Sequence, residues 1–271
     1  MLTNRDANAT GRRWRRAALA VALAASVAGC ANSRLTTGSV DRGSARPVAQ
    51  MSSQELQNAA VTLGQAFAKA PTDKGVAIRY ANVLQMTGKT DQSLAVMRKL
   101  AIAHPKDRSV LAAYGKALAA AGEFETALDA VRRAQTPEYP DWKLFSAEAA
   151  ILDQLGNSAQ ARTLYRKALD LKPDEPSILS NLGMSYVLEG DLRTAETYLR
   201  QAAAAPGADS RVRQNLALVV GLQGRFDEAE KLARQELSPN QAEANVAYLR
   251  SMLAQQNAWS EIKKEDKKAT N

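Results

Sequence analysis

The sequence contains one cysteine, Cys30, and one histidine, His104. A single cysteine cannot form a disulfide within the chain, and the two residues are too few for a zinc site built from the usual cysteine and histidine ligands. His104 precedes Pro105 at the expected end of a helix, where a cation would complement the helix C-terminus. One histidine in a turn does not make a Ser–His–Asp arrangement. The sequence therefore predicts no enzymatic activity, no metal and no cofactor, and Cys30 is the residue whose chemistry needs an explanation.

The segment before Cys30 has the regions of a signal peptide. Four arginines within residues 12–16 precede an uncharged apolar run over residues 17–28. That run is too short to span a bilayer, which takes about 20 apolar residues, but it suits a signal-peptide core. Residues 27–30 read Val-Ala-Gly-Cys, which resembles the bacterial lipobox, with valine in place of the more common leucine.

The resemblance to the lipobox implies that residues 1–29 are removed and that the Cys30 thiol accepts a diacylglyceryl group. Small side chains let an extended backbone enter the peptidase, and several acyl chains together hold a protein firmly at a membrane. Ala31, and not aspartate, follows the cysteine. By resemblance to enterobacterial sorting, this implies the outer membrane of a Gram-negative bacterium, with the chain facing the periplasm. The alternative is an ordinary buried Cys30 behind an ordinary signal peptide.

The next segment, residues 30–50, reads as a lipidated cysteine followed by a flexible tether. It is rich in Ser, Thr, Gly and Arg, has no apolar period, and cannot bury enough surface to offset its ordering entropy. The formal net charge of the chain is +8, but residues 1–29 hold five arginines and one aspartate. The remaining charge is mild and alternates in sign along the sequence, so we expect no nucleic-acid partner.

Glycine recurs at a fixed interval of 34 residues. A small residue lies five positions after each of these glycines, and another lies seven positions before it. The glycines are Gly88, Gly122, Gly156, Gly190 and Gly224, the small residues after them are Ser93, Ala127, Ala161, Ala195 and Ala229, and those before them are Ala81, Gly115, Ala149, Gly183 and Ala217. A period of this length indicates a solenoid of stacked helical hairpins.

These positions resemble the tetratricopeptide repeat (TPR) pattern. The resemblance implies an all-α superhelical solenoid over residues 51–259, with a preceding helix over 52–69, five helix-turn-helix repeats, a closing helix over 240–256 and a charged tail over 260–271. In each repeat the small residue of the first helix meets the small residue of the second, and the glycine adopts the left-handed conformation that ends a helix. The repeats are 74–107, 108–141, 142–175, 176–209 and 210–243.

Three residues depart from the pattern. Glu148 replaces a usual leucine, so it is either paired with a base or turned towards the groove. Arg213 stands at a position that is often tryptophan, and Glu236 stands at a position that is usually small. These two residues predict a loosened fifth repeat.

The first helices of TPR repeats line the concave face of the superhelix, so that face is the expected protein-binding groove. Asn181 and Asn215 hold equivalent positions in successive repeats. In TPR grooves that grip extended peptides, asparagine at this position binds the peptide backbone, because an amide both donates and accepts. The alternative is that these polar residues are simply solvated. The expected groove residues are Arg79, Asn82, Lys116, Lys143, Asn181, Gln214 and Asn215.

One specific binding mode is not expected. The TPRs that hold chaperone C-termini use a clamp of five basic and asparagine positions. Asn82 and Lys143 match that clamp, whereas Ile78, Ala113 and Ala147 do not. A cytosolic co-chaperone role is therefore unsupported.

The combination of signal peptide, lipid-accepting cysteine, tether and TPR array resembles the TPR lipoproteins of the tight-adherence (Flp) pilus machinery. It is similar in plan to the TPR pilotins of type IV pili. The resemblance implies an outer-membrane assembly factor with a protein partner, a secretin or another pilus-assembly component. The alternatives are a general envelope scaffold, for peptidoglycan synthesis or outer-membrane protein assembly, and an enzyme or enzyme subunit.

Overall fold

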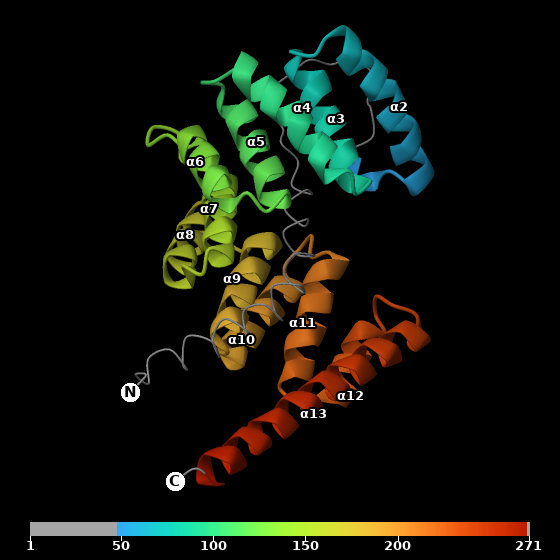
Figure 1. Cartoon of the computed structure of the whole chain (residues 1–271), viewed down its shortest axis with the longest axis vertical. Coiled ribbons are helices and arrows are strands. Elements are labelled where there is room, and N and C mark those ends of the chain that lie inside the picture. Colours follow the sequence, from blue (N-terminus) through green and yellow to red (C-terminus); the bar gives the residue numbers. More distant parts are fainter. Residues whose placement is uncertain (1–47, 270–271) are drawn as a thin grey trace. The chain divides into compact units, whose positions relative to one another are not determined.

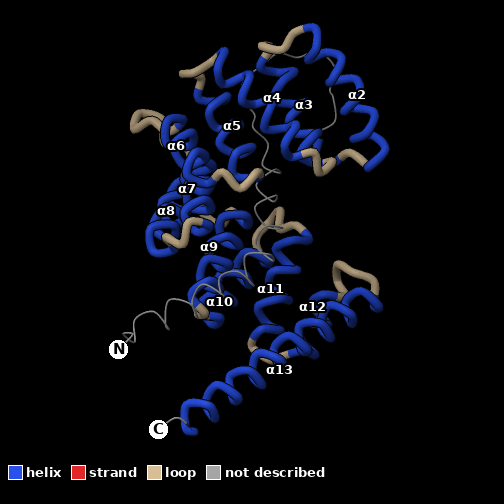
Figure 2. Tube along the Cα trace, in the orientation of Figure 1, coloured by secondary structure: helices blue, strands red, loops and turns tan. Residues whose placement is uncertain are grey.

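The computed structural model describes residues 48–269, which are helical apart from turns and one isolated β-bridge between Thr136 and Tyr139 (Figures 1 and 2). The expected all-α fold is confirmed. A short 3₁₀ turn, η2 (Val48–Gln50), is followed by α2 (Ser53–Lys69), α3 (Lys74–Met86), α4 (Thr90–Ala103), α5 (Arg108–Ala120), α6 (Phe124–Ala134), α7 (Trp142–Gln154), α8 (Ser158–Leu171), α9 (Pro176–Glu189), α10 (Leu192–Ala204), α11 (Ser210–Leu222), α12 (Phe226–Ala233) and α13 (Pro239–Ala269).

The helices fall into two compact units, one ending at Leu171 and the other beginning at Lys172. The first unit holds α2–α8 and the second holds α9–α13. Within each unit, helices pack mainly on the helices next to them in sequence, as expected for a stack of hairpins. Among the described residues, no helix is both long and apolar enough to cross a membrane.

The first helix of every repeat begins at the first residue of the predicted repeat, because local signals fix that position. Four of these helices follow an aspartate whose carboxylate accepts a backbone N–H of the first turn. The fifth, α9, begins with Pro176, whose missing N–H leaves no donor unsatisfied at that position. The capping residues are Asp73, Asp107, Asp141 and Asp209.

The glycines between the two helices of each repeat have the predicted left-handed backbone. Their φ angles lie between +75° and +86°, a region that costs a residue with a Cβ about 1–2 kcal/mol. This conformation ends the first helix and turns the chain into the second. The residues concerned are Gly88, Gly122, Gly156, Gly190 and Gly224.

The two helices of a repeat approach closely at the predicted small residues. A Cβ at Gly183 would lie 2.9 Å from Leu199 Cγ and 3.0 Å from the Ala195 carbonyl oxygen. In the first repeat the Ser93 hydroxyl donates to the Ala81 carbonyl oxygen at 2.8 Å. The backbones are therefore close enough that a larger side chain would not fit.

The fifth repeat is irregular, as its two departures from the repeat pattern predicted. Its second helix, α12, is only 8 residues long, but the two departures from the repeat pattern compensate each other. Arg213 Nε forms an ion pair with Glu236 Oε1, and Arg213 Nη1 donates to the Ala208 carbonyl oxygen at 3.0 Å. The short α12 agrees with the predicted loosening, whereas the ion pair ties α11 to the segment that follows α12.

The two terminal helices flank the five repeats. A capping box starts α2, in which the Ser52 hydroxyl accepts from Glu55 N and the Glu55 carboxylate accepts from Ser52 N. At the other end, α13 packs through Ala242, Val246 and Leu249, which are at most 7% exposed. It continues to Ala269, past the predicted end of the closing helix and through most of the predicted tail. Lysine and glutamate are good helix formers, so a charged sequence can extend a helix.

Candidate protein-binding surface

All of the expected groove residues lie on the first helices of their repeats and are at least partly exposed to solvent. In α3, Arg79 and Asn82 are partly exposed, whereas Ala77, Ala81 and Leu84 on the same helix are buried. Lys116 in α5 and Lys143 in α7 are also partly exposed. In the second unit Asn181 and Asn215 are partly exposed and Gln214 is exposed. Accessibility is what a binding role requires, and the binding itself stays a prediction.

The groove residues differ in how far their polar atoms are already used. Within residues 48–256, Arg79, Asn82 and Asn181 make no side-chain hydrogen bond or ion pair to another residue. Lys143 Nζ lies 5.4 Å from the centre of the Trp142 ring. The side chains of Arg79, Asn82 and Asn181 could therefore turn to a bound chain without breaking a polar contact of their own.

Asn215 is not equivalent to Asn181 in the structure. Its Nδ2 donates to the Ser180 hydroxyl of α9 at 3.1 Å, and so it links the first helices of successive repeats. The neighbouring Gln214 donates to the Ser210 hydroxyl at 2.9 Å. Sequence equivalence predicted one role for both asparagines, but only Asn181 keeps an uncommitted amide.

The structure tests the prediction for His104 but not the prediction for Cys30. Cys30 lies outside the described residues, so its lipidation is untested. His104 is the C-cap residue directly after α4, at the helix end where it was predicted, and its Nε2 lies 2.9 Å from the Thr72 carbonyl oxygen. Because a carbonyl only accepts, Nε2 must carry the proton, and His104 ties the end of α4 to the turn before α3.

Glu148 is paired, which decides between the two readings of this residue. Arg132 Nε donates to Glu148 Oε1 at 2.7 Å. Arg132 also belongs to a set of arginines that the repeat pattern did not predict. These arginines recur every 34 residues and lie in the second helix of each repeat or directly after it. We call these the arginine series: Arg98, Arg132, Arg166, Arg200 and Arg234. The recurrence was visible in the sequence, but the partners vary and depend on the fold.

The arginine series joins neighbouring helices in the first unit. Arg98 Nη2 lies 3.1 Å from Glu123 Oε1, where the next second helix begins. A hydrogen bond to Tyr114 and the charge of Glu123 raise the pKa of Arg98. Tyr114 and Glu148 each lie sixteen residues after their arginine. The arginine therefore contacts the same position of the following helix in both repeats.

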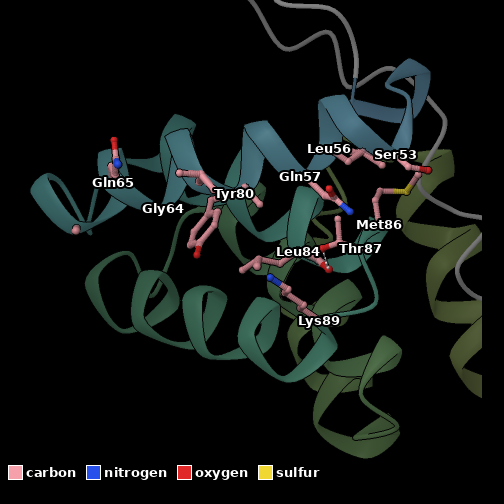
Figure 3. A pocket seen from close by; sticks show the side chains of 13 residues that line it. Ser53, Leu56, Gln57, Gly64, Gln65, Tyr80, Leu84, Met86, Thr87 and Lys89 are labelled. Carbon is pink, nitrogen blue, oxygen red and sulfur yellow. Dashed lines mark hydrogen bonds between the residues drawn. The ribbon is translucent and has the colours of Figure 1, made fainter.

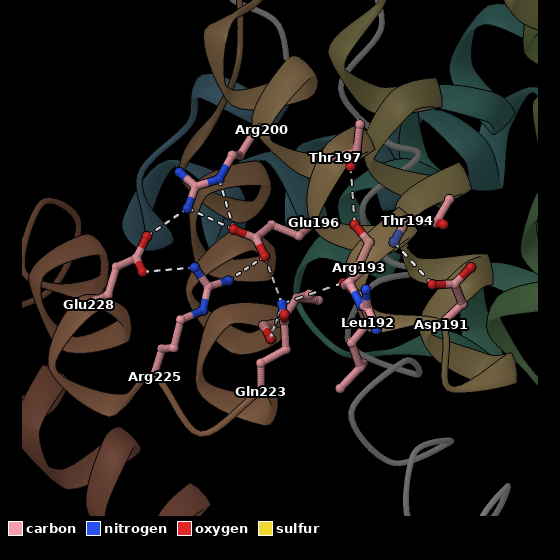
Figure 4. Close-up of polar contacts among 11 residues, drawn as sticks. Asp191, Leu192, Arg193, Thr194, Glu196, Thr197, Arg200, Gln223, Arg225 and Glu228 are labelled. Carbon is pink, nitrogen blue, oxygen red and sulfur yellow. Dashed lines mark hydrogen bonds and ion pairs between the residues drawn. The ribbon is translucent and has the colours of Figure 1, made fainter.

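In the second unit the series is part of a larger network around Glu196 of α10 (Figure 4). Arg200 lies 2.7 Å from Glu196 and 2.6 Å from Glu228 of α12. Arg225 also pairs with both carboxylates, and Gln223 Nε2 donates to Glu196 at 2.8 Å. Burial alone would raise the pKa of Glu196, but the hydrogen bonds from Gln223, Arg200 and Arg225 lower it below its ordinary value. The network links α10 to α12, and each of its two arginines is paired with both of its glutamates.

Comparison with protein families agrees with the hairpin geometry. Profiles described as tetratricopeptide repeat match residues 50–117, 109–133 and 146–209, which together span more than half of the chain. This chain is a tetratricopeptide repeat protein. Its repeats form a protein-binding scaffold, and no side-chain set for catalysis emerges among the described residues of this TPR array. A comparison with curated protein sequences finds no match.

Several solved structures share the TPR fold. A chain of the APC/C hetero-tetramer Cut9–Hcn1 is similar with a TM-score of 0.60 and 16% identity, over 74% of this chain and 41% of that one. PilW, a widely conserved type IV pilus biogenesis factor, is similar with a TM-score of 0.56 and 18% identity, over 74% of this chain and 91% of that one. The pilF protein of Pseudomonas aeruginosa gives 0.51 and 22%, over 67% and 83%. At these identities the likeness establishes the fold alone.

Proposed function

We propose that this TPR protein is an outer-membrane lipoprotein that assists assembly of a tight-adherence (Flp) pilus, in the manner of TadD-like proteins. Its partner would be a secretin or another pilus-assembly component in the periplasm. The observation that carries the proposal is the order of features in the sequence. Residues 27–30, with Cys30 at the lipid-accepting position, lie directly ahead of a tether and a TPR array. PilW supports it as a pilus biogenesis factor with the same fold.

The mechanism is one of effective concentration. A lipid on Cys30 would confine the TPR array to the membrane surface, and the segment up to residue 50 would let it stand off that surface. A partner bound by the TPR helices is then held where assembly takes place, so a modest affinity gives high occupancy. The groove residues with uncommitted polar atoms, Arg79, Asn82 and Asn181, are the first candidates for that contact.

The test compares the native protein with a Cys30→Ser variant in the cell. Both are crosslinked and purified, their partners are identified by mass spectrometry, and secretin multimers are followed on gels. We expect the native protein to recover a secretin or another pilus-assembly component, and we expect the variant to lose membrane attachment. Loss of secretin multimers in the variant would identify the pilotin-like activity.

The outcome that would contradict the proposal is equally specific. Recovery of cell-wall or outer-membrane assembly proteins, with secretin multimers unchanged, would replace it with a general envelope scaffold. A Cys30→Ser variant that fractionates with membranes as the native protein does would remove the anchor from the argument. A Cys30→Ala variant serves as a control, because it removes the thiol without adding a hydroxyl.

A further inference from the structure

The arginine series has no member in α2, the helix that precedes the five repeats. Gly64 in α2 lies 34 residues before Arg98 and therefore holds the arginine position of that helix. Sixteen residues later comes Tyr80 in α3, the equivalent of Tyr114, which contacts Arg98. The hydroxyl oxygen of Tyr80 would lie 3.1 Å from a Cβ at Gly64. The junction of α2 and α3 therefore has the tyrosine but lacks the arginine side chain that contacts it in the next repeat.

A groove of about 930 Å³ opens at this junction, between α2 and the segment from α3 to the start of α4 (Figure 3). Leu56 and Leu84 line it and are at most 7% exposed. Val61 and Met86 also line it, yet they are 64% and 43% exposed. Together these two side chains offer a partner an exposed apolar surface on both sides of one groove.

The groove also differs in charge from the next junction, where an arginine and a glutamate neutralise each other. Lys89 stands where the following repeat has Glu123, the partner of Arg98. Gly64 and Lys89 thus hold the positions that Arg98 and Glu123 occupy at the next junction. Lys89 is the one charged residue among those that line the groove. Within the described part of the chain, its ammonium group has no ion-pair partner.

We propose that this groove is a docking site for an acidic, apolar segment of a partner protein. An apolar side chain of that segment packs on Val61 and Met86, the exposed apolar side chains of the groove, and a carboxylate pairs with Lys89. The apolar contact supplies the affinity, and the single cation fixes the sign of the charge that is accepted. None of the predicted groove residues, such as Arg79 and Asn82, lines this site, so it is a second surface of the scaffold.

The charge also argues against an occupant from this chain. The segment over residues 31–47 contains three arginines and one aspartate. It therefore carries the same sign of charge as Lys89 and has few carboxylates to offer. An acidic partner is complementary, whereas the chain's own upstream segment is not. The docking site stands independently of the pilus proposal, because it requires only a partner of this chemistry.

The experiment measures binding of a labelled peptide to the full chain purified in mild detergent. The probe is a short fluorescein-labelled peptide that alternates leucine with glutamate, and its counterpart has glutamine in place of glutamate. Fluorescence anisotropy gives the dissociation constants for the native protein and for Gly64→Arg and Lys89→Glu. Gly64→Arg restores the arginine series and needs only a small shift of the Tyr80 ring. Lys106→Glu, an exposed charge reversal outside the groove, is the matched control.

We expect the glutamate peptide to bind at least about tenfold more tightly than its glutamine counterpart, which corresponds to about 1.4 kcal/mol. Gly64→Arg and Lys89→Glu should each weaken binding by a similar factor, with helicity by circular dichroism unchanged, and Lys106→Glu should not. Equal binding of the two peptides, or binding that neither groove variant changes, would overturn the proposal. Self-association in sedimentation that Gly64→Arg abolishes would also overturn it, because a second copy would then occupy the groove.

Discussion

Gly183 lies in the middle of α9, where glycine lowers helix stability by about 1 kcal/mol relative to alanine. Helix propensity alone would therefore favour Gly183→Ala. The close approach to Leu199 and the Ala195 carbonyl oxygen, at 2.9 and 3.0 Å from the added Cβ, opposes it. We predict that the clash wins and that Gly183→Ala lowers the free energy of unfolding by about 1–2 kcal/mol, measured by urea denaturation.

The control for this substitution is Gly75→Ala, in the first turn of α3. The nearest atom to a Cβ there is Asp73 Oδ1 at 3.4 Å, an ordinary contact. Removing backbone freedom from the unfolded chain should then raise stability by up to about 1 kcal/mol. The two substitutions are chemically identical, so they should differ in sign. Stabilisation by both would mean that α9 and α10 do not need the glycine for their packing.

Asp107 provides a test of pH dependence at the same scale. Lys74 Nζ lies 2.5 Å from Asp107 Oδ2, and the hydrogen bonds from Lys74 and Ser109 hold the pKa of Asp107 well below its ordinary value. A carboxyl group with a lowered folded pKa stabilises the fold above its unfolded pKa of about 3.9, and that contribution is lost as the pH falls towards the folded pKa. We predict that Asp107→Asn has a lower Tm than the native protein at pH 7 and that the gap narrows below about pH 4.

Asparagine is a suitable replacement at this position because it caps helices about as well as aspartate. The substitution therefore removes the charge and keeps a side chain that can accept from the first turn of α5. Thermal unfolding followed by circular dichroism from pH 7 to pH 3 measures the gap. A constant difference in Tm over that range would assign the effect to capping geometry and not to the pair with Lys74.

At the scale of elements, α13 is held to its unit by one face. Leu249 is 7% exposed, and its Cδ2 fills the space that a Cβ at Gly221 of α11 would need. Its neighbour Tyr248 is 73% exposed. We predict that Leu249→Ala lowers the free energy of unfolding by about 2–4 kcal/mol because it leaves a cavity against α11. Tyr248→Ala should change it by no more than about 0.5 kcal/mol, and similar losses in urea denaturation would contradict this packing.

The elements that the sequence predicted best are those with local signals. The repeats begin at the predicted residues because an aspartate or a proline marks each start, and they turn at glycines that the chain needs for positive φ. The extent of α13 was not predicted, because charged helix formers carry no burial pattern. The partners of Glu148 and Asn215, which are Arg132 and Ser180, were not predicted either. They join separate helices, and one sequence does not reveal which side chains meet across such a junction.

At the scale of the whole molecule, stability should be distributed along the chain and not concentrated in one core. Within each unit the helices pack mainly on their sequence neighbours, so the loss of one contact reaches the rest only through successive interfaces. Leu118 in α5 and Val220 in α11 hold the same repeat position and are both fully buried. They are a matched pair of probes, one in each compact unit.

We predict that Leu118→Ala lowers hydrogen-exchange protection in α5 and α6 and leaves α11 and α12 protected, whereas Val220→Ala does the reverse. Mass spectrometry of peptides from both units measures this in one experiment, and the native chain gives the reference rates. Each variant serves as the control for the other, because both shorten a buried aliphatic side chain at the same repeat position. Equal loss of protection in both units from either substitution would mean that the array opens as a single cooperative body, and the nearest-neighbour description of its stability would then be wrong.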